Sequence, residues 1–223
     1  MQGLNRFDGQ RFVEYSVRDG LGSASVFDVL ETREGDYWVA TEAGVSRFAR
    51  AQVNRDGVAH PPAGPAKLFT NHVVGTGAAN IVNVLYQDRA GRIIVGTDDG
   101  AVQIERSPDG GVTFRKLDLG LTTPANDTLR IRAFLEDREG SLWIGTSRGV
   151  VRRLPGGEMV EHQLAPAGQP DYVRALLQDK DGRIWMGHKF GLIAFVPESH
   201  TALAARQALS PNRFVALDVG RLS

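Results

Sequence analysis

Cysteine is absent from the 223-residue sequence, so disulfides, thiolate metal sites and cysteine nucleophiles are excluded. No run of about eighteen apolar residues occurs, so no membrane-spanning helix is predicted. Gly3-Leu4-Asn5-Arg6-Phe7 already reads as part of a folded repeat, so no signal peptide is predicted either. An excess of either charge is also lacking, since 26 Lys and Arg balance 26 Asp and Glu. A neutral chain has no electrostatic footprint for nucleic acid, and a membrane is expected to be reached only through flanking segments.

Glycine and proline, in contrast, are frequent, with 26 and 10 copies, and punctuation at that density disfavours long helices. Four similar segments recur along the chain and end at Gly44, Gly100, Gly149 and Gly191. Their spacing is close to the roughly 40–50 residues of a propeller blade. The widest interval contains Asn54–Pro65, which is interpreted as an inserted loop.

Each segment predicts four short strands. Apolar-rich first strands are expected at Val26–Glu31, Ile81–Gln87, Ile131–Glu136 and Val173–Gln178. An acidic turn that ends in glycine follows, then a second strand carrying Trp38, Ile94, Trp143 or Trp185, then a short turn and a third strand. Weaker fourth strands are expected at Ala66–Thr70, Val112–Leu117 and Met159–Leu164.

The predicted fold is therefore all-β, a β-propeller of four-stranded antiparallel blades in one domain over residues 1–223. Full blades are placed at 26–70, 81–117, 129–164 and 172–196. Residues 1–25 read as the second half of a blade. Residues 214–223 read as the beginning of another, because Phe214–Asp218 resembles a first strand. The chain is expected to be a fragment of a larger ring, the alternative being a closed five-bladed ring.

The repeat resembles the two-component regulator propeller family of bacterial sensor proteins. The clearest copy is Asp137-Arg-Glu-Gly-Ser-Leu-Trp-Ile-Gly-Thr-Ser-Arg-Gly149, while Thr32 replaces the usual Asp, Ile94 the Trp and His188 the Thr. The resemblance implies a periplasmic sensor domain, attached in the whole protein to a membrane helix and to a histidine kinase or a diguanylate cyclase.

Several short motifs have structural explanations. The three tryptophans recur at one repeat position, so each is expected to be buried between blades. Gly145-Thr-Ser-Arg-Gly149 spells a nucleophile elbow but lies in a predicted hairpin, where the mechanism does not operate. Ser107-Pro-Asp-Gly-Gly111 resembles an Asp-box, a hairpin in which the Asp binds backbone N–H groups.

A metal or cofactor site is not predicted. The five histidines lack ligand spacing, and the acidic turns are too short for a calcium loop.

Candidate ligand-binding residues lie in the turns between second and third strands and at the entries to the first strands. Both sets are expected at the mouth of the propeller channel, where polar side chains of different blades converge. The first set contains Glu42, Asp98, Asp99, Arg148, His188 and Lys189, and the second contains Arg132, Tyr172 and Arg174, with Asn80 and Arg130 beside them.

The function expected from these features is ligand or partner binding without catalysis, in a two-component or cyclic-di-GMP signalling protein. The partner is a small molecule, an oligosaccharide or a second copy of the propeller. Two other classes stay open. One is a secreted carbohydrate-active enzyme, a glycosidase or polysaccharide lyase, which would need paired carboxylates or an arginine cluster. The other is a protein-interaction scaffold, because adaptable loops on a rigid ring suit that role equally well.

Overall fold

The computed structural model describes residues 3–48, 67–120, 128–165, 171–189, 191–196 and 213–217. The chain divides into two compact units, unit 1 (Met1–Asp118) and unit 2 (Leu119–Ser223), and each is described by itself. In the described part, the only helical elements are two 3₁₀ turns, η1 (Val17–Asp19) and η3 (Gly77–Asn80). The inserted loop expected at Asn54–Pro65 lies outside the described residues, and the single domain stays a prediction.

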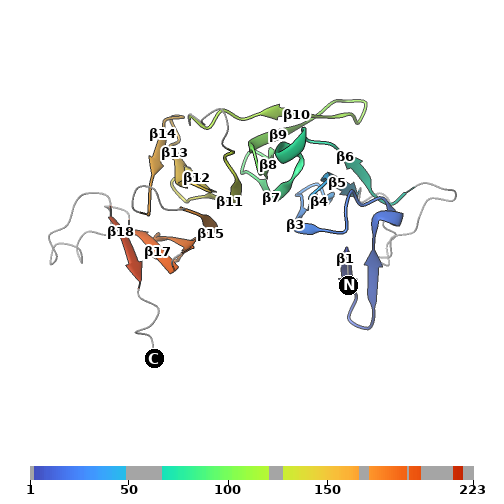
Figure 1. Cartoon of the computed structure of the whole chain (residues 1–223), viewed down its shortest axis with the longest axis horizontal. Helices are drawn as coiled ribbons and strands as arrows, with labels where there is room; N and C mark the ends of the chain where they lie inside the picture. Colours follow the sequence, from blue (N-terminus) through green and yellow to red (C-terminus); the bar gives the residue numbers. More distant parts are fainter. Residues whose placement is uncertain are drawn as a thin grey trace. The chain divides into compact units, whose positions relative to one another are not determined.

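Unit 1 contains an N-terminal hairpin and two four-stranded sheets (Figure 1). The hairpin consists of β1 (Leu4–Phe7) and β2 (Phe12–Tyr15). Blade 1 consists of β3 (Val26–Glu31), β4 (Tyr37–Thr41), β5 (Gly44–Phe48) and β6 (Thr70–His72). Blade 2 consists of β7 (Val82–Gln87), β8 (Ile93–Thr97), β9 (Gly100–Arg106) and β10 (Val112–Lys116).

Unit 2 contains two further four-stranded sheets. Blade 3 consists of β11 (Ile131–Glu136), β12 (Leu142–Thr146), β13 (Gly149–Arg153) and β14 (Met159–His162). Blade 4 consists of β15 (Val173–Gln178), β16 (Ile184–His188), β17 (Gly191–Val196) and β18 (Arg213–Leu217). In all four sheets the strands lie side by side in chain order and pair antiparallel, which is the blade of a β-propeller and confirms the predicted fold class.

The C-terminal end differs from the prediction. Phe214–Asp218 was expected to begin a further blade, whereas Arg213–Leu217 forms β18, the fourth strand of blade 4, and pairs with β17 from Val196 to Leu192. A short alternating strand carries no mark of its place in the repeat, and the free edge of β17 decides its pairing. The N-terminal prediction is confirmed: β1 and β2 pair as the third and fourth strands of a blade would, so residues 1–25 contain the second half of a blade.

Apolar side chains between consecutive blades form the core of each unit. In unit 1, Trp38 of blade 1 clusters with Val82, Leu85 and Ile93 of blade 2. In unit 2, the core contains the equivalent Trp143 of blade 3, together with side chains of blade 4. Both indoles are fully buried, which confirms the structural role predicted for these two residues. Truncation of an aromatic buried in this way typically costs about 3–5 kcal/mol.

Trp185, the third tryptophan, is only half-buried, so its predicted burial between blades was wrong. It pairs across the sheet with Leu177, as Trp143 pairs with Leu135 in blade 3. Leu135 packs into the core of unit 2, whereas Leu177 is 62% exposed. In the described part of unit 2, this face of blade 4 therefore lacks the covering that the same face of blade 3 has.

The Asp of the acidic turn serves the tryptophan of its own blade. Trp143 Nε1 donates to Asp137 Oδ2 at 2.7 Å, and Trp185 Nε1 donates to Asp179 Oδ2 at 2.8 Å. In blade 1 the Asp is replaced by Thr32, and the buried Nε1 of Trp38 has no hydrogen-bond partner among the described residues. The departure from the repeat at Thr32 thus leaves a buried donor unsatisfied, which is costly.

Other charges gather around Trp38. The guanidinium groups of Arg47 and Arg106 lie 5.6 and 5.3 Å from its ring centroid, and both pair with Asp36 Oδ2, at 2.7 and 3.3 Å. His72 of β6 lies 5.9 Å from the same indole. Blade 3 repeats part of this arrangement, with Arg152 at 4.8 Å and His162 at 6.3 Å from Trp143.

An arginine in the acidic turn ties each of two blades to the next. Arg33 Nη1 and Nη2 donate to the carbonyls of Arg89 and Asp88 in blade 2, at 3.0 and 2.8 Å. Arg138 of blade 3 donates to the carbonyl of Lys180 in blade 4 at 3.0 Å. These bonds fix the register of neighbouring blades within each unit.

The predicted Asp-box is confirmed at the hairpin between β9 and β10. The backbone N–H of Gly111 donates to Asp109 Oδ1 at 3.2 Å, and the Ser107 hydroxyl donates to the same oxygen. These two hydrogen bonds, first that from Ser107, lower the pKa of Asp109. The motif is a hairpin device on the outer edge of blade 2.

Candidate functional site

The turn between the second and third strands of a blade is fixed by a threonine. The hydroxyls of Thr41, Thr97 and Thr146 donate to the carbonyl three residues ahead at 2.9, 2.9 and 3.0 Å. The same hydroxyl accepts from the backbone N–H two residues ahead, and the turn closes on a glycine with positive φ, such as 105° at Gly149. The threonine and the glycine thus hold the turn, while the residues at its two middle positions differ from blade to blade.

A β-bulge occurs at one place in the first strand of all four blades. The pairing with the second strand skips one residue in each blade, and the skipped residues are Phe27, Asn83, Arg132 and Arg174. A bulge leaves one residue outside the ladder and re-aims its side chain. Arg132 and Arg174, predicted as site residues from their place at the strand entries, owe their orientation to this device.

The variable turn and the strand entry of a blade are bonded to each other. In blade 2 the N–H of Asp98 donates to the carbonyl of Ile81 at 3.0 Å, and in blade 3 the N–H of Ser147 donates to the carbonyl of Arg130 at 2.9 Å. In blade 4 the N–H of Lys189 donates to the backbone carbonyl of Tyr172 at 3.1 Å. The two sets of candidate residues therefore lie side by side, and together we call them the rim of their unit.

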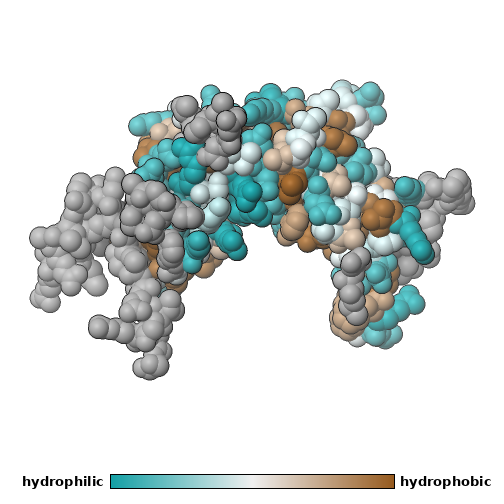
Figure 2. Space-filling view, in the orientation of Figure 1, coloured by the Kyte–Doolittle hydropathy of each residue, from teal (hydrophilic) through white to brown (hydrophobic). Residues whose placement is uncertain are grey.

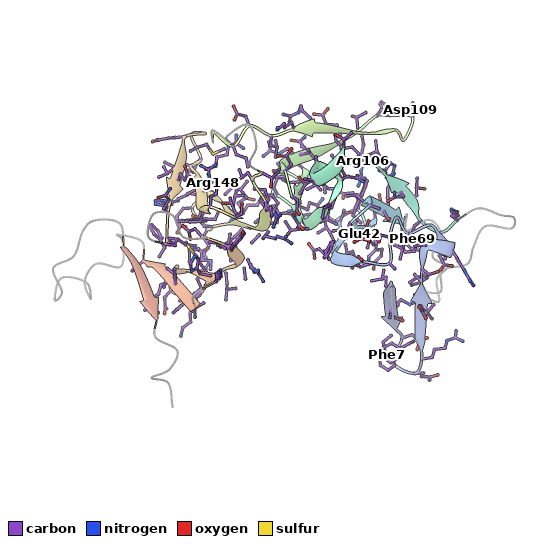
Figure 3. All side chains as sticks on the ribbon, in the orientation of Figure 1. Phe7, Glu42, Phe69, Arg106, Asp109 and Arg148 are labelled. Carbon is purple, nitrogen blue, oxygen red and sulfur yellow. The ribbon has the colours of Figure 1, made fainter. Side chains whose placement is uncertain are left out.

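The rim of unit 1 is acidic. Asp99 and Glu42 are exposed, and Glu42 accepts from the Ser23 hydroxyl at 2.9 Å (Figure 3 labels Glu42). Asp98 is half-buried and accepts from Asn83 Nδ2, the bulged side chain of β7, at 2.8 Å. Asn80 is a structural residue, because its Oδ1 accepts the N–H of Val74 at 3.0 Å.

The rim of unit 2 is basic. Arg174 and Lys189 are exposed, and Arg132, Arg148 and Tyr172 are half-buried. Arg148, labelled in Figure 3, has its Nη2 3.9 Å from Glu161 Oε1 and makes a backbone bridge to Asp171. This contrast with unit 1 could be read from the sequence only as a mixed-charge set.

His188 lies in a different environment from the expected rim. Its side chain is 2% exposed, and its Nε2 lies 2.6 Å from Oδ1 of the buried Asp171. The other oxygen of Asp171 accepts the N–H groups of Leu164 and Ala165, at 2.6 and 3.2 Å. Because His188 replaces the threonine of the turn, the pair joins this turn of blade 4 to the crossover from blade 3.

Sequence reasoning missed Asp171. Its repeat position could have indicated it, because Asp171 and Asn80 both lie just before a first strand. In the structure, each side chain accepts a hydrogen bond from a backbone N–H just after the preceding fourth strand.

A cavity of about 440 Å³ in unit 1 was also missed. It lies at the start of β8, the end opposite the rim, and its lining includes Glu34, Arg92, Gln103 and Arg106. Arg92 pairs with Asp88 at 2.6 Å and Arg106 with Asp36 at 3.3 Å, so both guanidinium groups already have carboxylate partners.

Within the described ranges, the side chains contain no group of three His, Asp or Glu residues placed to hold a metal ion. The same ranges contain no helix long and apolar enough to cross a membrane.

Comparison with protein families finds one match. The family described as two component regulator propeller matches residues 126–148 and 168–189, which include the first two strands of blades 3 and 4. No curated protein matches the chain by sequence.

Solved structures resemble the fold. The extracellular domain of what is described as a hybrid two component system of B. thetaiotaomicron is 19% identical, with a TM-score of 0.67 over 98% of this chain and 26% of that chain. PorZ, a surface component of the type-IX secretion system of Porphyromonas gingivalis, is 17% identical, with a TM-score of 0.56 over 89% and 30%. Virginiamycin B lyase from Staphylococcus aureus is 11% identical, with a TM-score of 0.57 over 93% and 59%. The chain thus spans about a quarter of the first of these structures, and the likeness shows the propeller fold.

Proposed function

Because the chain contains repeats of the two component regulator propeller family, we propose that it is part of an extracytoplasmic sensor propeller. In this proposal the propeller binds a ligand or a partner without chemistry, on the periplasmic side of a two-component or cyclic-di-GMP signalling protein. The two family matches carry the proposal. The likeness to an extracellular domain of a two component system supports the location.

The design of the repeat supports binding. Threonine hydroxyls, a positive-φ glycine and the bulges hold a fixed backbone, while the residues presented at the rim differ from blade to blade. A rigid scaffold that presents variable polar groups is the arrangement of recognition surfaces.

The carbohydrate-active enzyme remains the second class, and the likeness to a lyase is of fold alone. A glycosidase needs two carboxylates placed on either side of the scissile bond. In unit 2, Asp171 is buried and already accepts three hydrogen bonds, counting that with His188, which makes it unsuited to that role. The basic side chains at the rim of unit 2 suit ligand binding better than glycoside cleavage, which needs two carboxylates.

The test is a thermal-shift screen of neutral oligosaccharides and uronic acids against the chain, repeated with Arg148→Ala and Asp99→Ala. Arg115→Ala is the matched control, because Arg115 lies on the outer strand β10 and pairs with Glu105. A ligand that raises Tm, and loses this effect in one rim variant but not in the control, is the expected result.

Each incubation is also analysed by chromatography. Conversion of any compound to a product would refute binding without chemistry and favour the enzyme. Hits that are unaffected by both rim variants would place the binding site elsewhere. Complete absence of hits would favour the protein-interaction scaffold.

A further inference from the structure

The N-terminal hairpin occupies the place of the third and fourth strands of a blade in front of blade 1. The N–H of Gly3, just before β1, donates at 3.0 Å to the carbonyl of Ala24, just before β3. In unit 2 the N–H of Gly149, at the start of β13, donates at 2.6 Å to the carbonyl of Asp171, just before β15. β1 is therefore held on blade 1 in the same way as the third strand of blade 3 is held on blade 4.

The places of the first and second strands beside this hairpin are open among the described residues. β1 pairs with β2 along one edge, and no described strand pairs with its other edge. The corresponding edge of β5 in blade 1 is paired with β4, and β3 and β4 both pack on β7 of blade 2. By the same arrangement, two strands beside β1 would pack on β3.

The face of β3 toward these open places is exposed. Every second residue of β3 is exposed, with Phe27 at 49% and Val29 at 42%. Leu85 holds in β7 the position of Val29, two residues after the bulge, and it is only 6% exposed in the core between blades 1 and 2. We call Phe27, Val29 and Glu31, together with the free edge of β1, the open face. Among the described residues it lacks the two strands that cover its equivalent in blade 2.

Where such strands are present, a glutamine matches them to the next blade. Gln87, the last residue of β7, accepts the N–H of Arg33 at 2.9 Å, and its Nε2 donates to Glu34 at 3.2 Å. The same two hydrogen bonds, at 2.9 and 3.3 Å, join blades 3 and 4 through Arg138, Glu139 and Gln178. An Arg-Glu turn in one blade is thus matched by a glutamine at the end of the first strand of the next.

Blade 1 has a carboxylate at this position. Glu31 is the last residue of β3 and lies four residues after the bulge, as Gln87 does in β7. It is exposed and makes no hydrogen bond or ion pair with the residues that the structure describes. A carboxylate accepts an N–H as glutamine does, but it cannot donate, and it repels an acid in the facing turn. Glu31 therefore suits a turn in which the arginine is followed by a residue without negative charge.

We propose that the open face binds a β-hairpin of this same repeat, whose turn reads Asp-Arg-x-Gly with no acid at x. The second strand of the hairpin pairs with β1, the hairpin covers Val29, and the N–H of the turn arginine donates to Glu31. The chain contains one turn of this kind, Asp88-Arg89-Ala90-Gly91 of blade 2, whereas the turns of the other three blades have an acid at x. The carboxylate at the end of β3 thus selects which hairpin fits.

The pairing rule is tested first at the existing contact between blades 1 and 2. Gln87→Glu places a carboxylate opposite Glu34 and should lower the urea midpoint of the full chain by about 0.5 M. In a Glu34→Ala background the same substitution should lose about half of this effect or less, through the bond from Gln87 Nε2 to the carbonyl of Gly91. A loss that is equal in both backgrounds would overturn the rule.

Docking is tested by adding a hairpin to the full chain. A second copy of residues 81–99, the added hairpin, is fused directly in front of Gly3, because Gly3 has the repeat position of Gly100. We expect the urea midpoint to rise by about 0.5 M or more, because Val29 is buried and the edge of β1 is paired. The m-value should rise as well, because more surface is exposed on unfolding.

The turn of the added hairpin then tests the specificity. Ala90→Glu in the added hairpin alone should lower the midpoint of the fusion by about 0.5 M, because it faces Glu31. Glu31→Gln should reverse this loss, since the glutamine can donate to the new carboxylate. Glu14→Gln is the matched control, because Glu14 is exposed on the outer strand β2, and it should leave the loss unchanged.

A fusion with the midpoint and m-value of the wild type would overturn the docking site. A loss from Ala90→Glu that persists in Glu31→Gln, or that Glu14→Gln reverses equally, would overturn the selection by Glu31. None of these measurements involves a ligand, so they leave the proposed function untouched.

Discussion

Trp38 shows at the scale of one residue how a departure from the repeat changes a buried environment. Its neighbour Thr32 cannot supply the carboxylate that Asp137 supplies to Trp143, and Asp36 occupies the place where blade 3 has Ser141. Arg47 is the counterpart of Arg152, whose Nη2 lies 3.6 Å from Asp137. Blade 1 therefore contains all the surroundings of an Asp–Trp pair except the Asp itself.

The double variant Thr32→Asp/Asp36→Ser should raise the stability of the chain by about 1–2 kcal/mol, because it gives the buried indole N–H an anionic acceptor. The urea unfolding midpoint measures the effect. Thr32→Asp alone should gain less, since the Asp36 carboxylate stays beside the new one. A midpoint of the double variant at or below that of the wild type would contradict the role given to the hydrogen bond.

Two histidines should make stability depend on pH. Burial, with a smaller contribution from Arg47 and Arg152, lowers the pKa of His72 and His162. The unfolded chain, with an ordinary histidine pKa of about 6.5, then binds more protons than the folded chain. The contribution of these two histidines to stability is therefore fully present above the histidine pKa of the unfolded chain, and it is lost as the pH falls below that value.

We expect the urea midpoint to fall between about pH 7.5 and pH 5.5, and to fall less in His72→Gln/His162→Gln. Asp8 and Asp109 should contribute little to this window, because hydrogen bonds lower their pKa values further below it. The same slope in the wild type and in the double variant would show that other groups cause the pH dependence.

At the scale of the element, the turn between the second and third strands depends on its glycine for two reasons. Gly149 has φ 105°, and a Cβ there would lie 2.3 Å from the carbonyl oxygen of His162. Gly157, in the β13–β14 hairpin, has a similar φ of 94° but open space around the Cβ position. A comparison of alanine substitutions at these two glycines therefore distinguishes the cost of a positive φ from the cost of a steric clash.

Gly157→Ala should cost about 1–2 kcal/mol from the left-handed conformation alone. Gly149→Ala should cost about 3 kcal/mol or more, because the clash adds to the strain. Chemical denaturation of both variants compares them directly. Equal losses would mean that β14 moves aside at little cost.

The strands and hairpins were largely predictable, because the glycines of the turns recur at the same positions in each repeat. Glycines after the acidic turn and after the second strand mark the hairpins, and the apolar strands lie between them. β18 was misplaced because its pattern fits any strand position, and only the free edge of β17 determines where it pairs. Trp185 was misjudged for a related reason: its repeat position predicts an inward side chain, but burial requires a covering blade.

The candidate site was predictable in position and less so in chemistry. The variable turn residues stand out from a constant background, so Arg148, Asp99 and Lys189 could be found from the repeat alone. The bulges could not, because the skipped residue has no sequence mark and Phe27 and Arg132 share only a position. The buried Asp171–His188 pair needed the third dimension, since it joins a crossover to a turn in the next blade.

At the scale of the whole molecule, two further faces lack, among the described residues, the partners that equivalent faces have. Phe48 of blade 1 is 6% exposed in the core next to the N-terminal hairpin, whereas its counterpart Phe7 is 56% exposed. The Phe7 ring is tilted by 33° against that of Phe12, with the ring centroids 4.8 Å apart. The end of this hairpin shows apolar colouring in Figure 2, where Figure 3 labels Phe7. The second face is that of Leu177 and Trp185 on blade 4.

Because one face is of the kind that follows a blade and the other of the kind that precedes one, they are complementary to each other. The isolated chain should therefore associate head to tail as its concentration rises, which light scattering measures. Phe7→Glu and Leu177→Glu should each give monomers, since each removes one of the two faces.

A mixture of the two variants should form a one-to-one dimer, because each retains the face that the other has lost. A self-complementary contact through either face alone would behave differently: one variant would remain associated by itself. A monomeric wild type with cooperative melting would instead indicate that the faces are covered within the chain, as in a closed ring.

The bulge in each first strand bears on how such proteins diverge. Phe27, Asn83, Arg132 and Arg174 stand outside the ladder, so an exchange there disturbs neither the pairing before it nor the pairing after it. Duplication of this repeat copies the pattern of strands and turns together with one bulge position, where a substitution leaves the strand pairing intact. New recognition can then arise by a single substitution in one blade, while the remaining copies continue to specify the same backbone.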